Sequence, residues 1–148
     1  MKKLLMMATV TLGLMLGSTV NASDGWLTDF TKAKADAKMS KKMILADFSG
    51  SDWCGWCIKL DKEVFQKSIF KKFAKENLIL LMVDFPRDKK NQSSYVQKQN
   101  AAMAKKYKIR GFPTVLILDF NGKVVAQTGY QRGGAQAYID LLKKLMKK

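Results

Sequence analysis

The sequence predicts an α/β sandwich with a mixed central sheet. Apolar strand-like runs alternate with amphipathic helix-like segments along most of the chain, and this alternation is typical of a sheet with crossover helices. Near the C-terminal end, the dipeptide Asn121-Gly122 stands between two apolar runs, which predicts an antiparallel hairpin. A hairpin joined to parallel strands makes the sheet mixed. The expected order is helix, strand, helix, strand, helix, strand, strand, helix.

Residues 1–22 have the parts of a secretory signal peptide. Lys2 and Lys3 precede an apolar core that runs from Leu4 to Leu16, and small residues follow it up to Ala22. The core is shorter than the about 20 apolar residues that cross a bilayer, although an uncleaved anchor stays open as an alternative. We therefore expect a cut after Ala22, one domain over 23–148, and a periplasmic or secreted protein. Disulfides form and persist in those compartments.

The chain after the signal peptide is strongly basic. All 12 acidic residues but only 25 of the 27 basic ones lie after Ala22. Such a balance is typical of a preference for acidic partners or an anionic membrane surface, or of lysines that only solvate helix faces. The second interpretation is favoured because the lysines are spread over every expected helix. No basic-aromatic pattern predicts nucleic-acid binding, and without a recognisable dimerisation segment we expect a monomer.

The first helix and the first strand follow the signal peptide. The strand is the nearly continuous apolar run 43–48, which is typical of a strand buried on both faces. The helix before it would begin at a cap on Ser23 or Asp24. Its apolar side would consist of residues three or four positions apart, namely Trp26, Phe30, Ala33 and Ala37.

The later elements follow from the same patterns. A helix is expected over 57–73, with a bend near Ser68, because apolar residues recur there at helical spacing. The next strand is the branched, apolar run 78–85, which Pro86 ends. Parallel pairing of the two strands needs a crossover, which this helix supplies. The remaining expected elements are a helix over 95–108, strands over 115–120 and 123–129, and a last helix after Gly133 and Gly134.

The only two cysteines, Cys54 and Cys57, lie three positions apart between the expected strand 43–48 and helix 57–73. A CxxC motif at such a junction indicates redox chemistry. The reactive form of cysteine is the thiolate, and the unpaired N–H groups and positive dipole of a helix N-terminus favour an anion there. We therefore predict that Cys54 is the nucleophile. Cys57, one turn later on the same helix face, would resolve the mixed disulfide.

Two other interpretations of the cysteines compete with redox chemistry. A structural disulfide over four residues would remove little entropy from the unfolded chain, roughly 2 kcal/mol against about 3 kcal/mol for a fifteen-residue loop. A structural zinc site usually needs four Cys or His ligands. Because the chain has no third cysteine and no histidine, two copies would have to share their cysteines to bind a metal. We therefore expect no metal.

Asp47 is the one charged residue in the expected strand 43–48. A buried carboxylate is unfavourable unless it is protonated, paired or functional. In the functional interpretation, burial raises its pKa and it accepts the proton of Cys57 when the mixed disulfide is resolved. In the alternative, it is an acid at the end of a strand that reaches solvent or caps a turn. The residue pattern alone leaves both open.

The sequence resembles the thioredoxin family in two motifs, Trp53-Cys54-Gly55-Trp56-Cys57 and Gly111-Phe112-Pro113-Thr114. The resemblance covers the whole chain after the signal peptide and implies the thioredoxin fold, a three-layer α/β/α sandwich with about four strands. It implies that Pro113 is a cis-proline packed against the disulfide, and that the backbone of Phe112 pairs with an extended substrate segment. It also places Asp47 on the family's buried acid. The family's first strand is expected to be missing here or replaced by the opening helix.

Trp56 departs from the family pattern. It stands where thioredoxin has proline and where the disulfide isomerases and strong oxidases have histidine. Without that histidine no imidazolium can stabilise the Cys54 thiolate, which makes a strongly oxidising protein less expected. Together with Trp53, Trp56 offers an aromatic surface that would bind an apolar partner segment. The alternative is that Trp56 only packs against the loop before the helix.

Taken together, the residues and the resemblance predict a periplasmic or secreted thiol:disulfide oxidoreductase that acts on protein thiols and disulfides, as a reductase. It would need no cofactor besides the redox-active disulfide Cys54-Cys57. A membrane or periplasmic redox partner would supply this pair with electrons. The substrate-binding residues would be Trp53, Trp56, Phe112 and Pro113. The alternatives are a disulfide isomerase or oxidase, and a non-catalytic module that binds proteins through the same surface.

Overall fold

A five-stranded mixed sheet forms the centre of residues 25–147, the part of the chain that the computed structural model describes. The strand order is β1-β3-β2-β4-β5, with β1, β2 and β3 parallel and β4 and β5 antiparallel to their neighbours. The strands are β1 (Trp26–Leu27), β2 (Met43–Ser49), β3 (Leu78–Asp84), β4 (Thr114–Leu118) and β5 (Val124–Thr128). The expected signal peptide over 1–22, with its cut after Ala22, lies outside the described residues.

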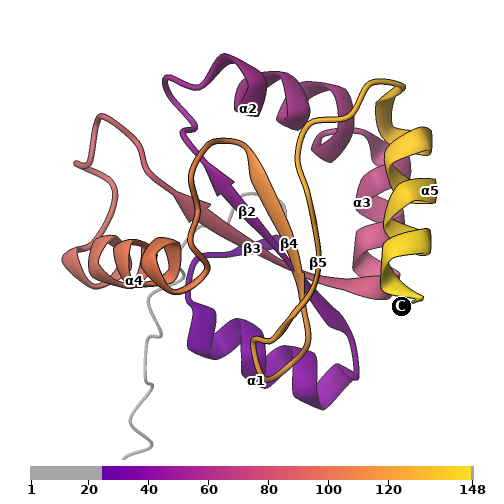
Figure 1. The fold of residues 1–148 in the computed structure, drawn as a ribbon, viewed down its shortest axis with the longest axis horizontal. Helices are drawn as coiled ribbons and strands as arrows, with labels where there is room; N and C mark the ends of the chain where they lie inside the picture. The colour runs from indigo at the N-terminus through magenta and orange to yellow at the C-terminus, as the bar shows by residue number, and fades with distance from the viewer. Residues whose placement is uncertain (1–24, 148) are drawn as a thin grey trace, which may run out of the picture.

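Helices cover both faces of the sheet, which confirms the expected three-layer α/β/α sandwich (Figure 1). On one face lie α1 (Phe30–Ser40) and α4 (Ser94–Lys106). On the other lie the helical segments that follow the cysteines, together with the last helix. These segments are α2 (Gly55–Leu60), the π-helical turn η2 (Asp61–Phe65), α3 (Ser68–Asn77) and α5 (Gly134–Met146). Within the described residues, none of the helices has the length and apolar character needed to cross a membrane.

Strand β2 lies in the middle of the sheet and is buried on both faces, as its sequence predicts. Because side chains alternate along a strand, its residues divide between the two cores. Ile44, Ala46 and Phe48 pack in the core under α1 and α4. Leu45 packs in the other core, with Leu60 of α2. Asp47 stands two residues after Leu45, so its side chain lies on the same face of the strand and points to the layer that contains the cysteines.

The beginning of the domain differs from the expectation. Trp26 lies in strand β1, opposite Leu80 of β3, and not on the first helix. Helix α1 begins at Phe30, and its N-cap is Asp29, whose carboxylate accepts the N–H of Lys32 at 2.9 Å. The proposed caps Ser23 and Asp24 lie outside the described residues. A strand of two residues is too short to show a period, so Trp26 and Phe30 matched helical spacing by coincidence. The family's first strand is present after all.

The expected helix over 57–73 is divided into three parts. Helix α2 continues into η2, where the N–H of Gln66 donates to the carbonyl of Asp61 at 2.9 Å, five residues back. This π turn contains one more residue than an α turn, and it leaves both Val64 and Phe65 buried. The chain is then extended at Lys67, and α3 starts at Ser68, where the bend was expected.

Strand pairing brings two loops to one end of the sheet. Strands β2 and β4 are antiparallel, with Phe48 opposite Thr114, so the end of β2 lies beside the start of β4. The cysteine motif follows β2, and Pro113 immediately precedes β4. The two motifs on which the family resemblance rests are therefore neighbours in space, although about 60 residues of sequence separate them.

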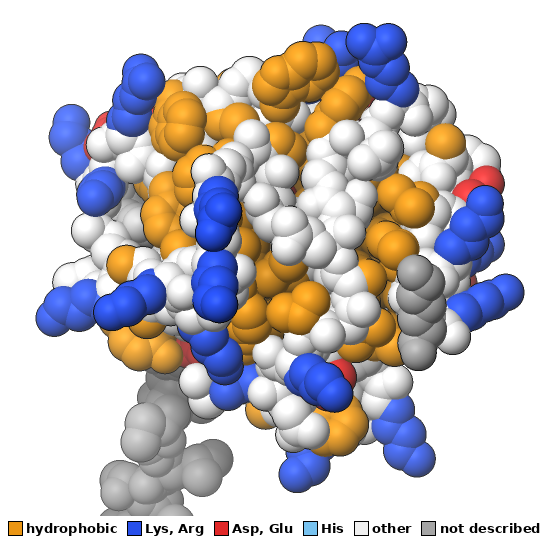
Figure 2. Space-filling view, viewed as in Figure 1, with side chains coloured by type: hydrophobic (Ala, Val, Ile, Leu, Met, Phe, Trp, Pro, Cys, Tyr) orange, Lys and Arg blue, Asp and Glu red, His pale blue; other side chains and the backbone are white. Residues whose placement is uncertain are grey.

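The basic residues are spread over the surface. In the face that Figure 2 shows, Lys and Arg side chains lie around the whole outline and over several elements, and acidic side chains are few. This distribution agrees with lysines that solvate helix faces. The interpretation of the basic charge as a preference for acidic partners therefore has no localised patch to support it on this face.

Candidate functional site

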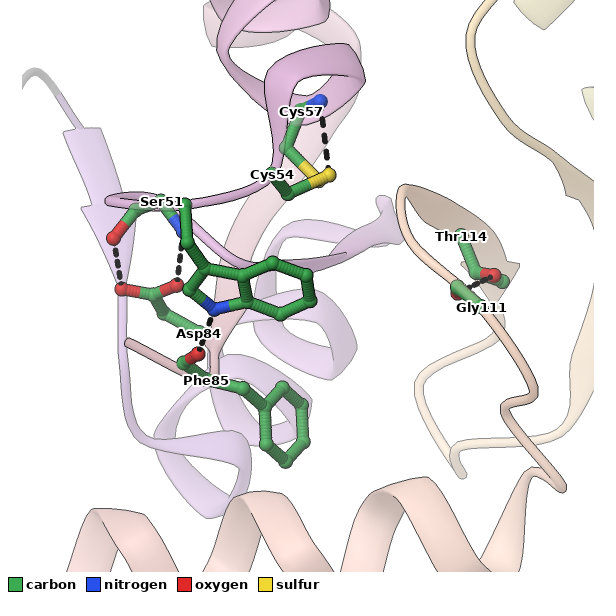
Figure 3. The surroundings of a disulfide bond; sticks show 8 residues. Ser51, Cys54, Cys57, Asp84, Phe85, Gly111 and Thr114 are labelled. Atoms are coloured by element: carbon green, nitrogen blue, oxygen red, sulfur yellow. Dashed lines mark hydrogen bonds between the residues drawn. A yellow bond between two sulfur atoms is a disulfide. The ribbon is translucent and has the colours of Figure 1, made fainter. Parts of the chain in front are cut away.

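Cys54 and Cys57 form a disulfide at the N-terminus of α2, with their Cα atoms 5.2 Å apart. Cys54 is the N-cap residue, in an extended conformation, and its Sγ accepts the backbone N–H of Cys57 at 3.2 Å (Figure 3). Cys54 is 7% exposed and Cys57 3% exposed. The geometry suits Cys54 as nucleophile and Cys57 as resolving thiol, and these roles stay predictions.

The loop before the cysteines is tied to the end of β3. The Asp84 carboxylate accepts the backbone N–H of Ser51 at 2.9 Å and its hydroxyl at 2.5 Å. The indole N–H of Trp53 donates to the carbonyl of Phe85 at 2.8 Å. Figure 3 shows Ser51 and Asp84, joined by their hydrogen bonds, below the disulfide. The N–H of Cys54 donates to the carbonyl of Gly50 at 2.8 Å. Together these bonds fix the backbone from which Cys54 projects.

Asp52, in the loop before the cysteines, in turn binds the loop that follows β3. Its two carboxylate oxygens accept the backbone N–H groups of Arg87 and Asp88, each at 3.0 Å. The hydrogen bond from Asp88, and after it the one from Arg87, hold the pKa of Asp52 below its ordinary value, so the carboxylate stays ionised. The Arg87 guanidinium lies over the ring of Trp53, 5.6 Å from its centroid. The sequence did not predict these contacts of Asp52, because the groups that it binds are backbone N–H groups more than 30 residues away.

The loop before β4 contributes Phe112 and Pro113. The Phe112–Pro113 bond is cis, as the resemblance implies. The hydroxyl of Thr114 donates to the carbonyl of Gly111 at 2.7 Å and closes the loop. The ring of Phe112 meets Trp53 edge to face, with centroids 5.8 Å apart, and lies 5.3 Å from Phe85. Two of the predicted substrate-binding residues, Trp53 and Phe112, are therefore in contact.

Asp47 is buried, 3% exposed, and its Oδ1 has no hydrogen-bond partner. Desolvation raises its pKa to about 8, and the negative charges of Asp61 and Asp84 contribute further. Asp61 lies four residues after Cys57, on the same side of the helical segment. The carboxyl group is thus mostly protonated at neutral pH, and it lies on the side of β2 that faces the helix carrying Cys57. This environment excludes the alternative of an acid that reaches solvent or caps a turn, while its role in proton transfer stays a prediction.

Trp56 is 53% exposed, and the ring it packs against is Tyr130, whose centroid is 5.1 Å away. Tyr130 lies in the loop after β5, not in the loop before the helix that the alternative interpretation named. The Tyr130 hydroxyl donates to Oε2 of Glu63 at 2.7 Å. Sequence analysis did not identify Tyr130 or Glu63, since nothing in their spacing connects residues 67 positions apart.

No group of three or more His, Cys, Asp or Glu side chains is arranged to hold a metal ion within residues 25–147. The redox-active group of this site is the Cys54–Cys57 disulfide. In its oxidised form the pair can exchange with a thiol of another molecule, and in its reduced form with a disulfide, through Cys54, the more exposed of the two residues.

Comparisons with known proteins show the family to which the chain belongs. The profile of the thioredoxin-like domain matches residues 30–145. The disulfide bond reductase DsbH of Chlamydia pneumoniae is 37% identical over 118 residues, which cover 80% of this chain and 70% of that protein. The thioredoxin-related protein DsbJ of the same organism is 29% identical over 136 residues, which cover 87% of this chain but 38% of DsbJ.

Solved structures share the fold. A structure of DsbH oxidoreductase matches with a TM-score of 0.78 and 36% identity, over 82% of this chain and 83% of that one. A disulphide isomerase from Xylella fastidiosa Temecula1 matches with a TM-score of 0.60 over 92% of this chain and 99% of that one. At 21% identity, the second likeness shows the fold alone.

Proposed function

The chain belongs to the thioredoxin-like family and is a thiol:disulfide oxidoreductase, and from this premise we propose that it reduces disulfides of other proteins outside the cytoplasm. The observation that carries the proposal is the Cys54–Cys57 disulfide at the N-terminus of α2. The relative DsbH, whose name describes a disulfide bond reductase, supports this direction of electron flow. So does the lack of histidine, the residue that stabilises the thiolate in strong oxidases of the family.

The reaction starts from the reduced pair. The Cys54 thiolate attacks one sulfur of a client disulfide, a new bond forms between Cys54 and that sulfur, and the second client sulfur leaves as a thiolate that takes a proton from water. The N–H of Cys57, which bonds to Cys54 Sγ at 3.2 Å, stabilises the attacking thiolate together with the helix dipole. The product is a mixed disulfide between Cys54 and the client.

The second step releases the client. Cys57 loses its thiol proton and its sulfur attacks Sγ of Cys54, which re-forms the Cys54–Cys57 disulfide and expels the client's other sulfur as a thiolate. The client disulfide has gained two electrons and the protein dithiol has lost two. Cys57 is nearly fully buried, so its attack on the neighbouring Cys54 is favoured over attack on a foreign disulfide.

Asp47 is proposed to move the proton of the second step. Its ionised form accepts the proton of Cys57, and its protonated form returns that proton when a donor opens the disulfide again. Support comes from its pKa of about 8, which lets both forms be populated near neutral pH, and from its unpaired Oδ1 on the side of β2 that faces α2. A group with an ordinary pKa would remain ionised and could not donate.

The client segment is proposed to lie over Trp53, Phe112 and Pro113. Trp53 is 38% exposed and Phe112 half-buried, so both rings present part of their surface beside Cys54. Proline has no N–H group, which leaves the backbone of Phe112 to pair with an extended client chain. We propose that the protein acts as a monomer and needs no cofactor besides the disulfide.

The proposed compartment is the periplasm or the outside of the cell. Support comes from residues 1–22, whose charged start, apolar core and small residues up to Ala22 are those of a signal peptide. A reductase in an oxidising compartment must itself be reduced again. We therefore propose a membrane or periplasmic partner that supplies electrons to the Cys54–Cys57 pair.

Two experiments test the proposal: trapping of mixed disulfides with clients, and measurement of the reduction potential of the Cys54–Cys57 pair. A Cys57→Ala protein should accumulate mixed disulfides with client proteins, and a Cys54→Ala protein should accumulate none. The equilibrium reduction potential, measured in defined glutathione or dithiothreitol buffers, should lie near roughly −270 mV, the value of thioredoxin. A potential near roughly −120 mV would show an oxidase and reverse the proposed direction.

A binding module that does not use its cysteines is the rival proposal, because the aromatic rings of Trp53 and Phe112 could hold an unfolded chain without exchange. A Cys54→Ser protein separates the two. If it binds clients and restores function in cells as well as the unchanged protein, the redox proposal is wrong. If binding persists but function is lost, the exchange at Cys54 is required.

A further inference from the structure

Four side chains form a cluster beside the disulfide that the exchange reaction does not itself require. Trp56, Lys59 and Glu63 follow one face of α2 and η2, since they are three and four residues apart. Tyr130, from the loop after β5, lies along this face. We call these four residues the Trp56 cluster. It connects the residue between the two cysteines to a loop more than 70 positions away in the sequence.

Tyr130 restrains the other three members. Its ring lies 5.1 Å from that of Trp56, and its hydroxyl donates to Glu63 Oε2 at 2.7 Å. The Lys59 ammonium lies 5.2 Å from the Trp56 centroid and 5.4 Å from the Tyr130 centroid, and 3.8 Å from Glu63 Oε1. The bond to Glu63 raises the pKa of Tyr130, so its hydroxyl stays protonated and able to donate.

This arrangement fixes the Trp56 indole before any client arrives. An exposed tryptophan normally samples several rotamers, and ordering it on binding reduces affinity. Here the contacts with Tyr130 and Lys59 order the Trp56 side chain in the absence of a client, while 53% of Trp56 still faces solvent. One positive and one negative charge, on Lys59 and Glu63, largely compensate each other within the cluster. The surface offered next to the reactive sulfur is therefore aromatic more than charged.

We propose that Tyr130 is a specificity-determining residue of the exchange reaction: it holds Trp56 in place, and the two rings together bind apolar side chains that flank the client's cysteine. The inference rests on the proposed function and adds the chemistry of the preferred client. Disulfides flanked by leucine or phenylalanine are attacked faster than disulfides flanked by small polar residues. Such flanking residues are normally buried in a folded protein, so the preferred clients are incompletely folded chains.

The test compares rates on matched substrates. Two peptides carry one disulfide each and differ only in the residues flanking the attacked cysteine, leucine and phenylalanine in one and serine and threonine in the other. Bis(2-hydroxyethyl) disulfide, which has no flanking residues, reports on the exchange chemistry alone. With reduced protein, we expect the rate constant for the apolar peptide to exceed that for the polar one about tenfold.

Variants of the cluster should remove this preference for the apolar peptide. Tyr130→Ala should reduce the preference to about twofold or less, with a loss of rate on the apolar peptide that clearly exceeds any loss on bis(2-hydroxyethyl) disulfide. Tyr130→Phe keeps the ring, loses the bond to Glu63 and should give an intermediate preference. Trp56→Ala, at an exposed position, should also abolish it. Phe120→Ala, which removes an exposed ring at the opposite end of β4 from Thr114, is the control and should keep the full preference.

The outcomes separate this inference from the proposed function. If the unchanged protein reacts with bis(2-hydroxyethyl) disulfide but does not distinguish the peptides, the specificity inference is wrong and the proposed function stands. Equal losses on all three substrates in the Tyr130 variants would also overturn it, because Tyr130 would then act on the fold or on the cysteines. If the protein reduces none of the three, the proposed function fails first. A faster reaction with a peptide flanked by aspartate would contradict the inference and favour recognition by Lys59.

Discussion

The Sγ atom of Cys54 accepts the backbone N–H of Cys57, so the residue proposed as nucleophile caps the helix that carries its own partner. An N-cap side chain normally satisfies one of the unpaired N–H groups of the first turn. Here a sulfur atom does so. In the reduced protein, the same N–H and the helix dipole favour a negative charge on this sulfur.

The first prediction concerns the pKa of the Cys54 thiol in the reduced protein. In a Cys57→Ser variant, alkylation of Cys54 by iodoacetamide should rise with a midpoint clearly below about 8.5, the value of an unperturbed thiol. The Cys54→Ser variant gives the comparison, because Cys57 is nearly fully buried and burial disfavours the thiolate. Its midpoint should lie above about 8.5. Equal midpoints in the two variants would contradict the proposed division of roles.

The second prediction concerns the close approach of Gly50 to Trp53. A methyl group on Gly50 would lie 2.6 Å from Cζ2 and 2.7 Å from Nε1 of the Trp53 indole. Gly50→Ala should therefore displace the indole, break its hydrogen bond to Phe85 and lower the free energy of unfolding of the oxidised protein by about 1–3 kcal/mol. Urea unfolding measures the change.

Gly55→Ala is the matched control for this prediction. A methyl group at Gly55, the first residue of α2, meets nothing within 4 Å. Alanine loses less conformational entropy than glycine when a helix forms, so the free energy of unfolding should rise by about 0.5–1 kcal/mol. The two substitutions should thus have opposite signs. A stabilising effect of Gly50→Ala would show that the Trp53 ring is not held against this glycine.

The third prediction concerns the link between Ser51 and Asp84. The carboxylate of Asp84 accepts both the N–H and the hydroxyl of Ser51. Ser51→Ala removes the hydroxyl bond and should lower the free energy of unfolding by about 0.5–1.5 kcal/mol, whereas Asp84→Ala removes both bonds and should cost about 1.5–3 kcal/mol. In the double variant, the loss should be smaller than the sum of the two single losses. Additive losses would show that the two side chains do not interact in solution.

The core of the fold could be predicted from the sequence because its elements are long and strongly patterned. The run 43–48 is apolar without interruption except at Asp47, and the structure has β2 there with one more residue. The hairpin around Asn121-Gly122 was predicted from its turn residues, and β4 and β5 pair on either side of it. The family, the fold and the oxidoreductase activity were predicted correctly from the two motifs and are confirmed by the comparisons.

The elements that were missed depend on long-range contacts. Strand β1 has only two residues and is a strand only because β3 pairs with it. The π turn of η2 adds one residue to a single turn, and the apolar spacing of Leu60, Val64 and Phe65 fits an uninterrupted α-helix equally well. Tyr130 reaches Trp56 through a loop whose path depends on the whole sheet. The local sequence contains no signal for any of these features.

The last prediction concerns Asp47 and the dependence of stability on pH. Its pKa is about 8 in the folded protein, raised chiefly by burial, against 3.8 for the ordinary group. Between these two values the folded carboxyl keeps its proton while the unfolded one has lost it. The folded state therefore binds more protons than the unfolded state, and this group makes stability fall as pH rises through that range. Above the folded pKa the loss is complete and constant.

Asp47→Asn removes this titration, so the variant should be more stable than the unchanged protein, and increasingly so as pH rises. From about pH 5.5 to about pH 8.5, the difference in free energy of unfolding should widen by about 3 kcal/mol, measured by urea unfolding of the oxidised proteins. The same variant should resolve mixed disulfides at least about tenfold more slowly at neutral pH, because Cys57 loses its proton acceptor. A variant that gains stability but resolves at the normal rate would contradict proton transfer by Asp47, since burial alone explains the first effect and only proton transfer explains the second.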